Sequence, residues 1–122
     1  MTKPNTMMID DVEYVRKDSV QKEATKLDGM PYKVIRTRSA GVFAGYLAEQ
    51  NGDTVILKHA RRLWYWSGAA SLSQLAMEGV GNPDDCKFPC VVDEITLLGA
   101  IEVIGTTQKA KESIEAVSVW QN

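Results

Sequence analysis

The sequence predicts an α+β protein, built as an antiparallel β-meander or a small barrel-like sheet with two or three short helices. Residues 32–66 form short runs of strand-forming residues separated by turn residues, and short connections favour antiparallel neighbours. Asn51-Gly52 is a strong signal for a two-residue hairpin turn. Two stretches with helical periodicity, 69–78 and 108–117, are both short. The length of 122 residues, with 44% hydrophobic and 25% charged residues, fits one globular domain.

The N-terminal part is expected to differ from the rest, so that residues 1–31 form a leader and a possible helix and residues 32–122 a single β-rich domain. Residues 1–7 have the composition of a disordered leader. Over residues 8–27, apolar side chains recur at roughly helical spacing among charges of both signs, which predicts a helix with a thin apolar face. Asp28-Gly29-Met30-Pro31 reads as the turn at the boundary.

Four consecutive strands are predicted in the first half of the β-rich domain. They cover residues 32–38, 42–49, 54–58 and 61–66. Ser67-Gly68 ends this run, and a helix is predicted from Ala69 to Glu78, with Gly79 as its stop signal.

The second half is predicted to hold two further strands and a last helix. A short strand is expected over residues 86–92, interrupted at Pro89, and a longer one over residues 94–104. A helix from Gln108 to Val117 follows, because Ala110, Ile114 and Val117 fall on one face and Thr106 or Thr107 can cap its start.

The charge is unevenly placed. The chain carries a net charge of −2, yet residues 32–66 hold six Lys and Arg against two acids, which gives +4. A positive segment within an acidic protein suits a small polyanion better than duplex nucleic acid. The longest apolar run, 95–104, contains Gly99 and Glu102, so no membrane span is expected. The N-terminus lacks the apolar core of a signal peptide, and two cysteines suit a reducing compartment, so a cytoplasmic location is expected.

The densest chemistry lies at residues 58–66, Lys-His-Ala-Arg-Arg-Leu-Trp-Tyr-Trp. Strand alternation would place Arg62, Trp64 and Trp66 on one side of the sheet and Arg61 on the other. Guanidinium groups beside indole rings suit a nucleotide, whose phosphate is held by charge and whose base is held by stacking. The alternative is that the tryptophans are core and the arginines solvated. Within this pattern we expect Trp64 to be buried and Trp66, at the strand end, to reach a pocket mouth.

Other polar residues extend the candidate site. Arg36 and Arg38 share a strand face, where two cations repel unless an anion lies between them, although a solvated face gives the same pattern. His59, the single histidine, suits a ligand contact or a structural role better than catalysis, because spacing pairs it with no nucleophile. Asn82 can read a base edge or simply form a turn. The candidate ligand-binding residues are Arg36, Arg38, Lys58, His59, Arg61, Arg62, Trp64, Trp66 and Asn82.

No catalytic, metal or cofactor motif accompanies these residues. Cys86 and Cys90 lack the further ligands of a structural zinc site, and acidic pairs in loops are usually solvated. A Walker loop, a dinucleotide glycine fingerprint, an HExxH motif and a nucleophile elbow are all absent. We therefore expect a binding protein without metal or cofactor, and not an enzyme.

Three segments resemble a family of small bacteriophage and prophage proteins, over about residues 32–120. They are Arg36–Val42, Ala60–Ala69 and the block from Val92–Ile95 to Ala100–Ile104. The chain is also similar to phage anti-defence sponge proteins, which sequester nucleotide second messengers of bacterial immunity. That similarity implies a β-rich homo-oligomer with pockets between subunits, which binds a cyclic ADP-ribose-like or cyclic oligonucleotide signal in the host cytoplasm without hydrolysing it.

The expected function is therefore sequestration of a small nucleotide signal. Two alternatives belong to other classes. A tryptophan-rich face could dock on a host or phage protein, since aromatic residues and arginine are common interface anchors. The second alternative is a small enzyme that degrades a cyclic nucleotide, with His59 as general base.

Overall fold

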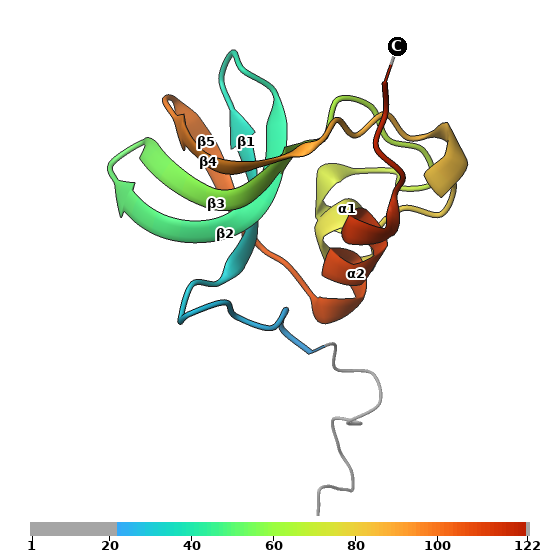
Figure 1. The fold of residues 1–122 in the computed structure, drawn as a ribbon, viewed down its shortest axis with the longest axis horizontal. Helices are drawn as coiled ribbons and strands as arrows, with labels where there is room; N and C mark the ends of the chain where they lie inside the picture. Colours follow the sequence, from blue (N-terminus) through green and yellow to red (C-terminus); the bar gives the residue numbers. More distant parts are fainter. Residues whose placement is uncertain (1–21, 122) are drawn as a thin grey trace, which may run out of the picture.

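The computed structural model describes residues 22–121, which form one antiparallel sheet covered on one side by two helices (Figure 1). The strand order is β4-β3-β2-β1-β5. The elements are β1 Tyr32–Thr37, β2 Val42–Asn51, β3 Thr54–Arg62, α1 Leu72–Glu78, the 3-10 helix η2 Pro83–Asp85, β4 Val91–Leu97, β5 Ala100–Gly105 and α2 Gln108–Ala116. The predicted α+β class and antiparallel meander are confirmed, with β5 added beside β1.

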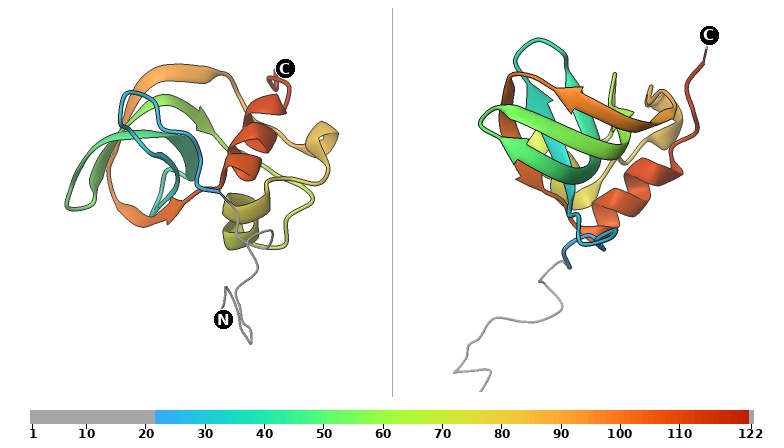
Figure 2. Two further views of the ribbon diagram at one scale, coloured as in Figure 1. Left: turned by 90° about the horizontal axis from the view of Figure 1, so that it is seen from below. Right: turned by 60° about the vertical axis from the view of Figure 1, so that its left-hand side comes forward.

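The sheet is strongly curved. Its two edge strands, β4 and β5, are joined by only Leu98 and Gly99, so the sheet must bend to bring its edges within reach of each other (Figure 2). Gly99 has φ +74°, a left-handed conformation that glycine adopts without steric cost. The single strand predicted over residues 94–104 is therefore wrong, because this turn divides it in two.

Two apolar clusters lie on opposite faces of the sheet. The concave face buries a cluster of sheet residues, namely Ile35, Phe43, Val55, Leu57, Ala60 and Leu97. The other face packs on α1, on α2 and on residues 86–90, which we call the segment before β4. Its buried residues include Val34 and Ala44 from the sheet, Leu75 and Ile114 from the helices, and Phe88. The three central strands, β1, β2 and β3, thus have two buried faces over part of their length.

Strand β3 contains a β-bulge at His59 and Ala60. Lys58 lies opposite Tyr46 and Arg61 opposite Ala44, so two residues of β3 face the single Gly45 of β2. A Cβ atom on Gly45 would lie 3.0 Å from the Cα of Ala60, which explains why glycine occupies the position. The strands predicted at 54–58 and 61–66 are wrong as separate elements: one bulged strand replaces them, and it ends at Arg62.

Three other predicted elements also differ from the structure. The helix at 69–78 starts later, at Leu72, where the Ser71 side chain caps it. The short strand at 86–92 is replaced by isolated bridges of Lys87 to Tyr65 and of Phe88 to Val119, and β4 begins only at Val91. Of the helix predicted over 8–27, the described residues 22–27 are not helical, and the rest of that prediction, with the leader, lies outside the described residues.

The last helix, α2, begins at Gln108 as predicted and ends at Ala116, one residue before the predicted end, with Val117 as its C-cap. The Thr107 side chain accepts a hydrogen bond from the Ala110 N–H at 3.1 Å and donates one to the Met77 carbonyl at 2.6 Å. These two bonds cap α2 and connect it to α1. The sequence allowed either Thr106 or Thr107 as the cap, and the structure has Thr107 in this position. Among the helices described, none is long and apolar enough to cross a membrane.

Candidate functional site

A cavity of about 360 Å³ opens where the sheet meets α2. We call it the helix–sheet cavity. It is lined by residues from the N-terminal segment, four strands and α2: Leu27, Tyr32, Tyr46, His59, Arg61, Val91 and Glu115. Its volume falls in the range of small-molecule sites, and its lining mixes rings, aliphatic groups and a few charges in the manner of such sites.

The bulge in β3 brings Arg61 to this cavity. Directly opposed residues in antiparallel strands share a face, so Arg61 lies on the helix side with Ala44, and Arg62 lies on the concave side with Phe43. If β3 had no extra residue, the alternation of side chains from Lys58 onward would place Arg62 on the helix side and Arg61 on the concave side. The bulge at His59 therefore decides which guanidinium lines the helix–sheet cavity.

Arg61 is almost completely buried, with 4% of its surface exposed. Its guanidinium donates hydrogen bonds to three backbone carbonyls: Nε to Pro89 at 2.9 Å, Nη1 to Ile114 at 2.9 Å and Nη2 to Phe88 at 3.0 Å. The guanidinium carbon also lies 5.4 Å from the centroid of the Phe88 ring. Arg61 thus joins β3 to the segment before β4 and to the end of α2.

The charge of Arg61 has no carboxylate partner within 4.0 Å among residues 22–121. Burial lowers its pKa, opposed by the nearby Tyr32 and Cys90 side chains, but an arginine stays charged in proteins. A guanidinium has five N–H groups, and the three hydrogen bonds leave two of them. A buried, uncompensated cation that borders a cavity favours an anion in that cavity.

Three aromatic rings follow one another along the cavity wall. The ring centroids of Tyr32 and Tyr46 are 5.1 Å apart, and those of Tyr46 and His59 are 6.3 Å apart, both in edge-to-face geometry. Lys111 of α2 covers the two tyrosines, with Nζ 5.4 Å from the Tyr46 centroid and 5.9 Å from that of Tyr32. Only 12% of the Lys111 side chain is exposed. A hydrogen bond to Tyr46 raises the pKa of Lys111, so this second cation stays charged.

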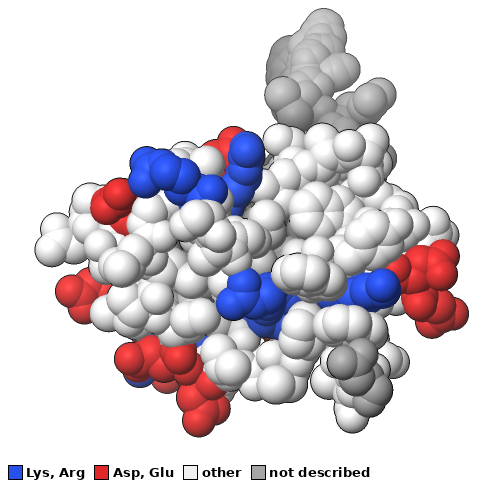
Figure 3. All heavy atoms as spheres, turned by 90° about the horizontal axis from the view of Figure 1, so that it is seen from above, with Lys and Arg blue, Asp and Glu red and all other residues white. Residues whose placement is uncertain are grey.

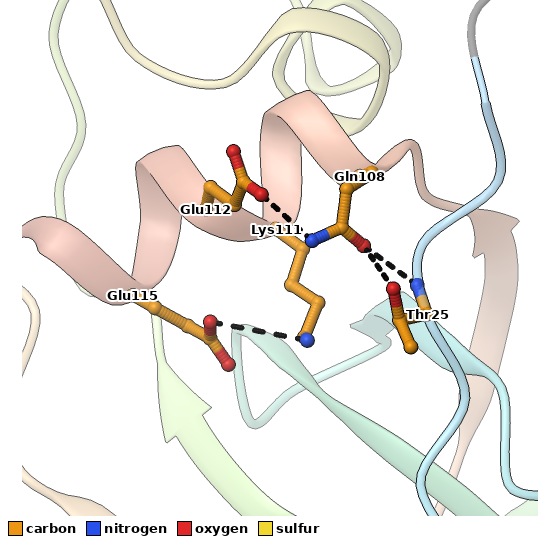
Figure 4. Close-up of polar contacts among 5 residues, drawn as sticks. All are labelled: Thr25, Gln108, Lys111, Glu112 and Glu115. Atoms are coloured by element: carbon orange, nitrogen blue, oxygen red, sulfur yellow. Dashed lines mark hydrogen bonds and ion pairs between the residues drawn. The ribbon is translucent and has the colours of Figure 1, made fainter.

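The face of α2 beside the cavity is held by a chain of polar contacts (Figure 4). Lys111 Nζ lies 4.0 Å from a carboxylate oxygen of Glu115, one turn further along the helix. Gln108 accepts two hydrogen bonds from Thr25, at 2.7 and 2.9 Å, and donates one to Glu112 at 2.8 Å. Arg61 and Glu115 line the cavity with opposite charges, and Lys111 adds a further positive charge beside the tyrosine rings of the wall.

Burial raises the pKa of Tyr32 well above its ordinary value of about 10, with Glu115 and Tyr46 adding to the effect and Arg61 opposing it. The folded protein therefore keeps a proton that the unfolded chain releases above pH 10. The stability contribution of Tyr32 is complete below pH 10 and falls above it, by about 1.4 kcal/mol per pH unit. We expect Tyr32→Phe to flatten the loss of stability between pH 10 and 12, measured by urea unfolding. The exposed Tyr65→Phe is the control and should leave the slope unchanged.

Arg62 lines a second, smaller cavity of about 140 Å³ on the concave face. Its guanidinium carbon lies 4.4 Å from the centroid of the Phe43 ring, and Nη1 donates a hydrogen bond to the Ala40 carbonyl at 2.5 Å. Pro89, Cys90 and Val92 complete much of this wall. The sheet separates the two cavities, because Arg61 lines the one on the helix side and Arg62 the one on the concave side.

The other predicted cations lie apart from both cavities. Arg36 pairs with Glu102 of β5 at 3.3 Å, and Lys58 pairs with Glu94 of β4 at 2.8 Å, which raises the pKa of Lys58. Arg38 follows the end of β1, is exposed, and donates its backbone N–H to the Gly99 carbonyl at 2.8 Å. The negative charge beside Arg36 and Lys58 thus comes from acidic residues of the neighbouring strands.

The expected division between the two tryptophans is reversed. Trp64 is 63% exposed, whereas Trp66 is partly buried against the core beneath the helices. The chain leaves the sheet after Arg62, so strand alternation no longer fixes these side chains. Asn82 lies at the start of η2, and its side-chain amide donates to the Ser67 hydroxyl at 3.1 Å, the turn-forming role that the sequence also allowed. The structure therefore places His59 and Arg61 together and the remaining candidates elsewhere.

Besides the aliphatic Leu27 and Val91, four residues of this site were not anticipated from the sequence: Tyr32, Tyr46, Lys111 and Glu115. They come from β1, β2 and α2, and each reads locally as an ordinary strand or helix residue. The usable signal was the i, i+4 pair of Lys111 and Glu115, which fixes one face of α2. Among residues 22–121, no three His, Cys, Asp or Glu side chains are placed to hold a metal ion.

The surface charge follows a simple pattern on the face seen from above (Figure 3). Lys and Arg side chains form a band across the middle of this face, with a second group near one edge, and Asp and Glu side chains lie mainly toward the rim. Central positive charge on an acidic protein favours the approach of a small anion.

Comparisons with known proteins identify a family but no function. No curated protein and no solved structure matches the chain. The model of a domain of unknown function, DUF6948, matches residues 30–114, and the chain therefore belongs to the DUF6948 family.

Proposed function

We propose that this protein binds a small phosphorylated nucleotide signal in the helix–sheet cavity and holds it without cleaving it. The observation that carries the proposal is Arg61, a buried guanidinium with free N–H groups and no carboxylate partner among the described residues, at the wall of a cavity of about 360 Å³. A phosphate oxygen there would complete the hydrogen bonding of Arg61 and neutralise its charge.

The rest of the cavity suits the remainder of a nucleotide. A base would pack against the rings of Tyr46 and His59, with Leu27 and Val91 beside it. Base–aromatic stacking contributes about 1–3 kcal/mol per base, and a charge-assisted hydrogen bond about 1.5–3 kcal/mol. Two or three such contacts reach the affinity that sequestration of a signal requires, after the costs of association.

The biological setting follows from the resemblance of the sequence to phage anti-defence sponges. In that setting the ligand is an immune second messenger, a cyclic ADP-ribose-like or cyclic oligonucleotide signal, and the protein works in the host cytoplasm as a homo-oligomer. A barrel-like form of the curved sheet belongs to the same proposal, supported by the two-residue connection between its edge strands. Such a frame would hold the cavity wall rigid.

A protein-interaction module is the second candidate. Exposed aromatic side chains favour it, since Trp64, Tyr65 and Trp120 all present large apolar surface to solvent. Lys87 lies between two of these rings, 5.9 Å from the Tyr65 centroid and 5.7 Å from that of Trp120. This aromatic surface does not border the helix–sheet cavity, so the two functions can be tested separately.

The test is a retention experiment. The purified protein is incubated with cyclic ADP-ribose, ADP-ribose or cyclic di-AMP, freed of unbound ligand by gel filtration, and heat-denatured. Mass spectrometry then identifies what was released. Recovery of one intact nucleotide in stoichiometric amount is the expected result. Recovery of a cleaved product would favour an enzyme with His59 as general base, and no retention of any of the three would favour the interaction module.

A further inference from the structure

His59 has an unusual backbone conformation within a strand. Its φ is +49°, and Asp28, with φ 51°, is the other non-glycine residue in the left-handed region within residues 22–121. Asp28 lies in the turn between Leu27 and Met30, where aspartate commonly adopts this conformation. His59 instead lies in the interior of β3, as the first residue of the bulge opposite Gly45.

The bulge needs a left-handed residue, but it does not need histidine. In bulges of this kind the first residue is usually glycine, because a Cβ atom in the left-handed region meets the following carbonyl oxygen. The bulge cannot be dispensed with, because it sets the faces of Arg61 and Arg62. Histidine at this position therefore carries a steric cost that glycine would avoid.

Packing and hydrogen bonding do not compensate for this cost. His59 is exposed, and no hydrogen bond or ion pair joins its imidazole to another residue in the described part of the chain. Its closest aromatic neighbour, Tyr46, lies edge-on with ring centroids 6.3 Å apart. His59 does line the helix–sheet cavity, two residues along the chain from Arg61.

We propose that His59 is kept in this conformation because its imidazole donates a hydrogen bond to a phosphate of the bound ligand. The inference rests on the proposed function and makes it more specific. The ligand carries a phosphodiester or a pyrophosphate that lies between the imidazole and the free N–H groups of Arg61, at the mouth of the cavity. A left-handed residue with a functional side chain is a common way to store strain at a binding site.

Two substitutions separate binding from folding. His59→Gly keeps the bulge and removes both the strain and the imidazole, so its melting temperature without ligand should equal or exceed that of the wild type. Its affinity for the retained nucleotide should fall at least tenfold, measured by titration calorimetry. His59→Asn tolerates the left-handed region and keeps an N–H donor, so its affinity should lie between that of the wild type and that of His59→Gly. Asp28→Gly, the control, relieves the same strain at a residue that does not itself line the cavity, and should bind like the wild type.

The possible outcomes distinguish this inference from the function on which it rests. If the wild type binds none of cyclic ADP-ribose, ADP-ribose and cyclic di-AMP, the proposed function fails and the role of His59 fails with it. If the wild type binds and His59→Gly binds as tightly, the function stands and the inference is wrong. A His59→Gly protein that melts below the wild type would also contradict it, because histidine would then be stabilising the fold.

Discussion

Arg61→Ala is expected to lower the free energy of unfolding by about 3–5 kcal/mol, although the substitution removes a charged residue from a small protein. The guanidinium donates charge-assisted hydrogen bonds to the carbonyls of Phe88, Pro89 and Ile114. Such bonds contribute about 1.5–3 kcal/mol each, and alanine replaces none of them. The Phe88 and Ile114 carbonyls keep a backbone N–H donor, from Trp120 at 3.0 Å and Val117 at 3.3 Å, whereas the Pro89 carbonyl loses the donor it has. The segment before β4 and the end of α2 would lose their shared anchor on β3.

The control for this prediction is the neighbouring Arg62→Ala. Arg62 contacts the Phe43 ring and one exposed carbonyl, so its loss should cost about 1 kcal/mol. Equilibrium urea unfolding of both variants, with the m-value checked for two-state behaviour, gives the comparison. Equal stability losses would mean that the hydrogen bonds of Arg61 do not hold the segments together.

Gly68→Ala is the second substitution with a large expected effect. Gly68 has φ +92°, and a Cβ atom there would lie 2.3 Å from the backbone nitrogen of Gly81 and 2.5 Å from that of Asn82. These backbones are in direct contact, since the Gly81 N–H donates to the Gly68 carbonyl at 3.1 Å and the Asn82 N–H to the Ser67 carbonyl at 3.2 Å. Backbone strain and the steric clash together should cost about 3 kcal/mol or more.

Gly52→Ala separates these two contributions. Gly52 has φ +63° in the β2–β3 turn, but the space around its missing Cβ is open. Its replacement should therefore cost about 1–2 kcal/mol from backbone strain alone. Thermal unfolding of both variants tests the difference. A Gly68→Ala protein as stable as Gly52→Ala would show that the two segments can move apart without loss.

Local sequence signals were sufficient for much of the fold. Asn51-Gly52 marked the turn between β2 and β3, and a threonine before Gln108 marked the start of α2. Both features depend on a few neighbouring residues, so they can be derived from the chain alone. Gly99 was placed inside a single predicted strand, because its role as the turn between the sheet edges depends on the curvature of the whole sheet.

The bulge in β3 could not be derived in this way. It requires Gly45 on the neighbouring strand, because any side chain there would meet Ala60. Simple alternation did separate Arg61 from Arg62, but it could not tell which arginine faces the helices. The same alternation of side chains was extended to Trp64, which lies beyond the end of β3, where strand alternation no longer applies.

The candidate site was assembled from residues that are close in sequence, and the structure distributes most of them. Arg36 and Lys58 are neutralised by acids from β5 and β4, which no local pattern indicates. Conversely, Lys111 reaches the tyrosine rings from the last helix. Of the original candidates, His59 and Arg61 share the helix–sheet cavity, and tertiary packing supplies their partners.

The most direct test of ligand binding in the helix–sheet cavity uses two neighbouring valines of β4. Val91, 52% exposed, lines the helix–sheet cavity, and Val92, 41% exposed, lines the Arg62 cavity on the opposite face. Tryptophan is well accepted in exposed strand positions, so Val91→Trp and Val92→Trp should both fold, and each fills only its own cavity.

The measurement is the affinity of both variants for the nucleotide that the wild type retains, by titration calorimetry. Val91→Trp is expected to weaken binding at least tenfold, while Val92→Trp stays within twofold of the wild type. Full-strength binding by Val91→Trp, with loss in Val92→Trp, would contradict the assignment and move the ligand to Arg62.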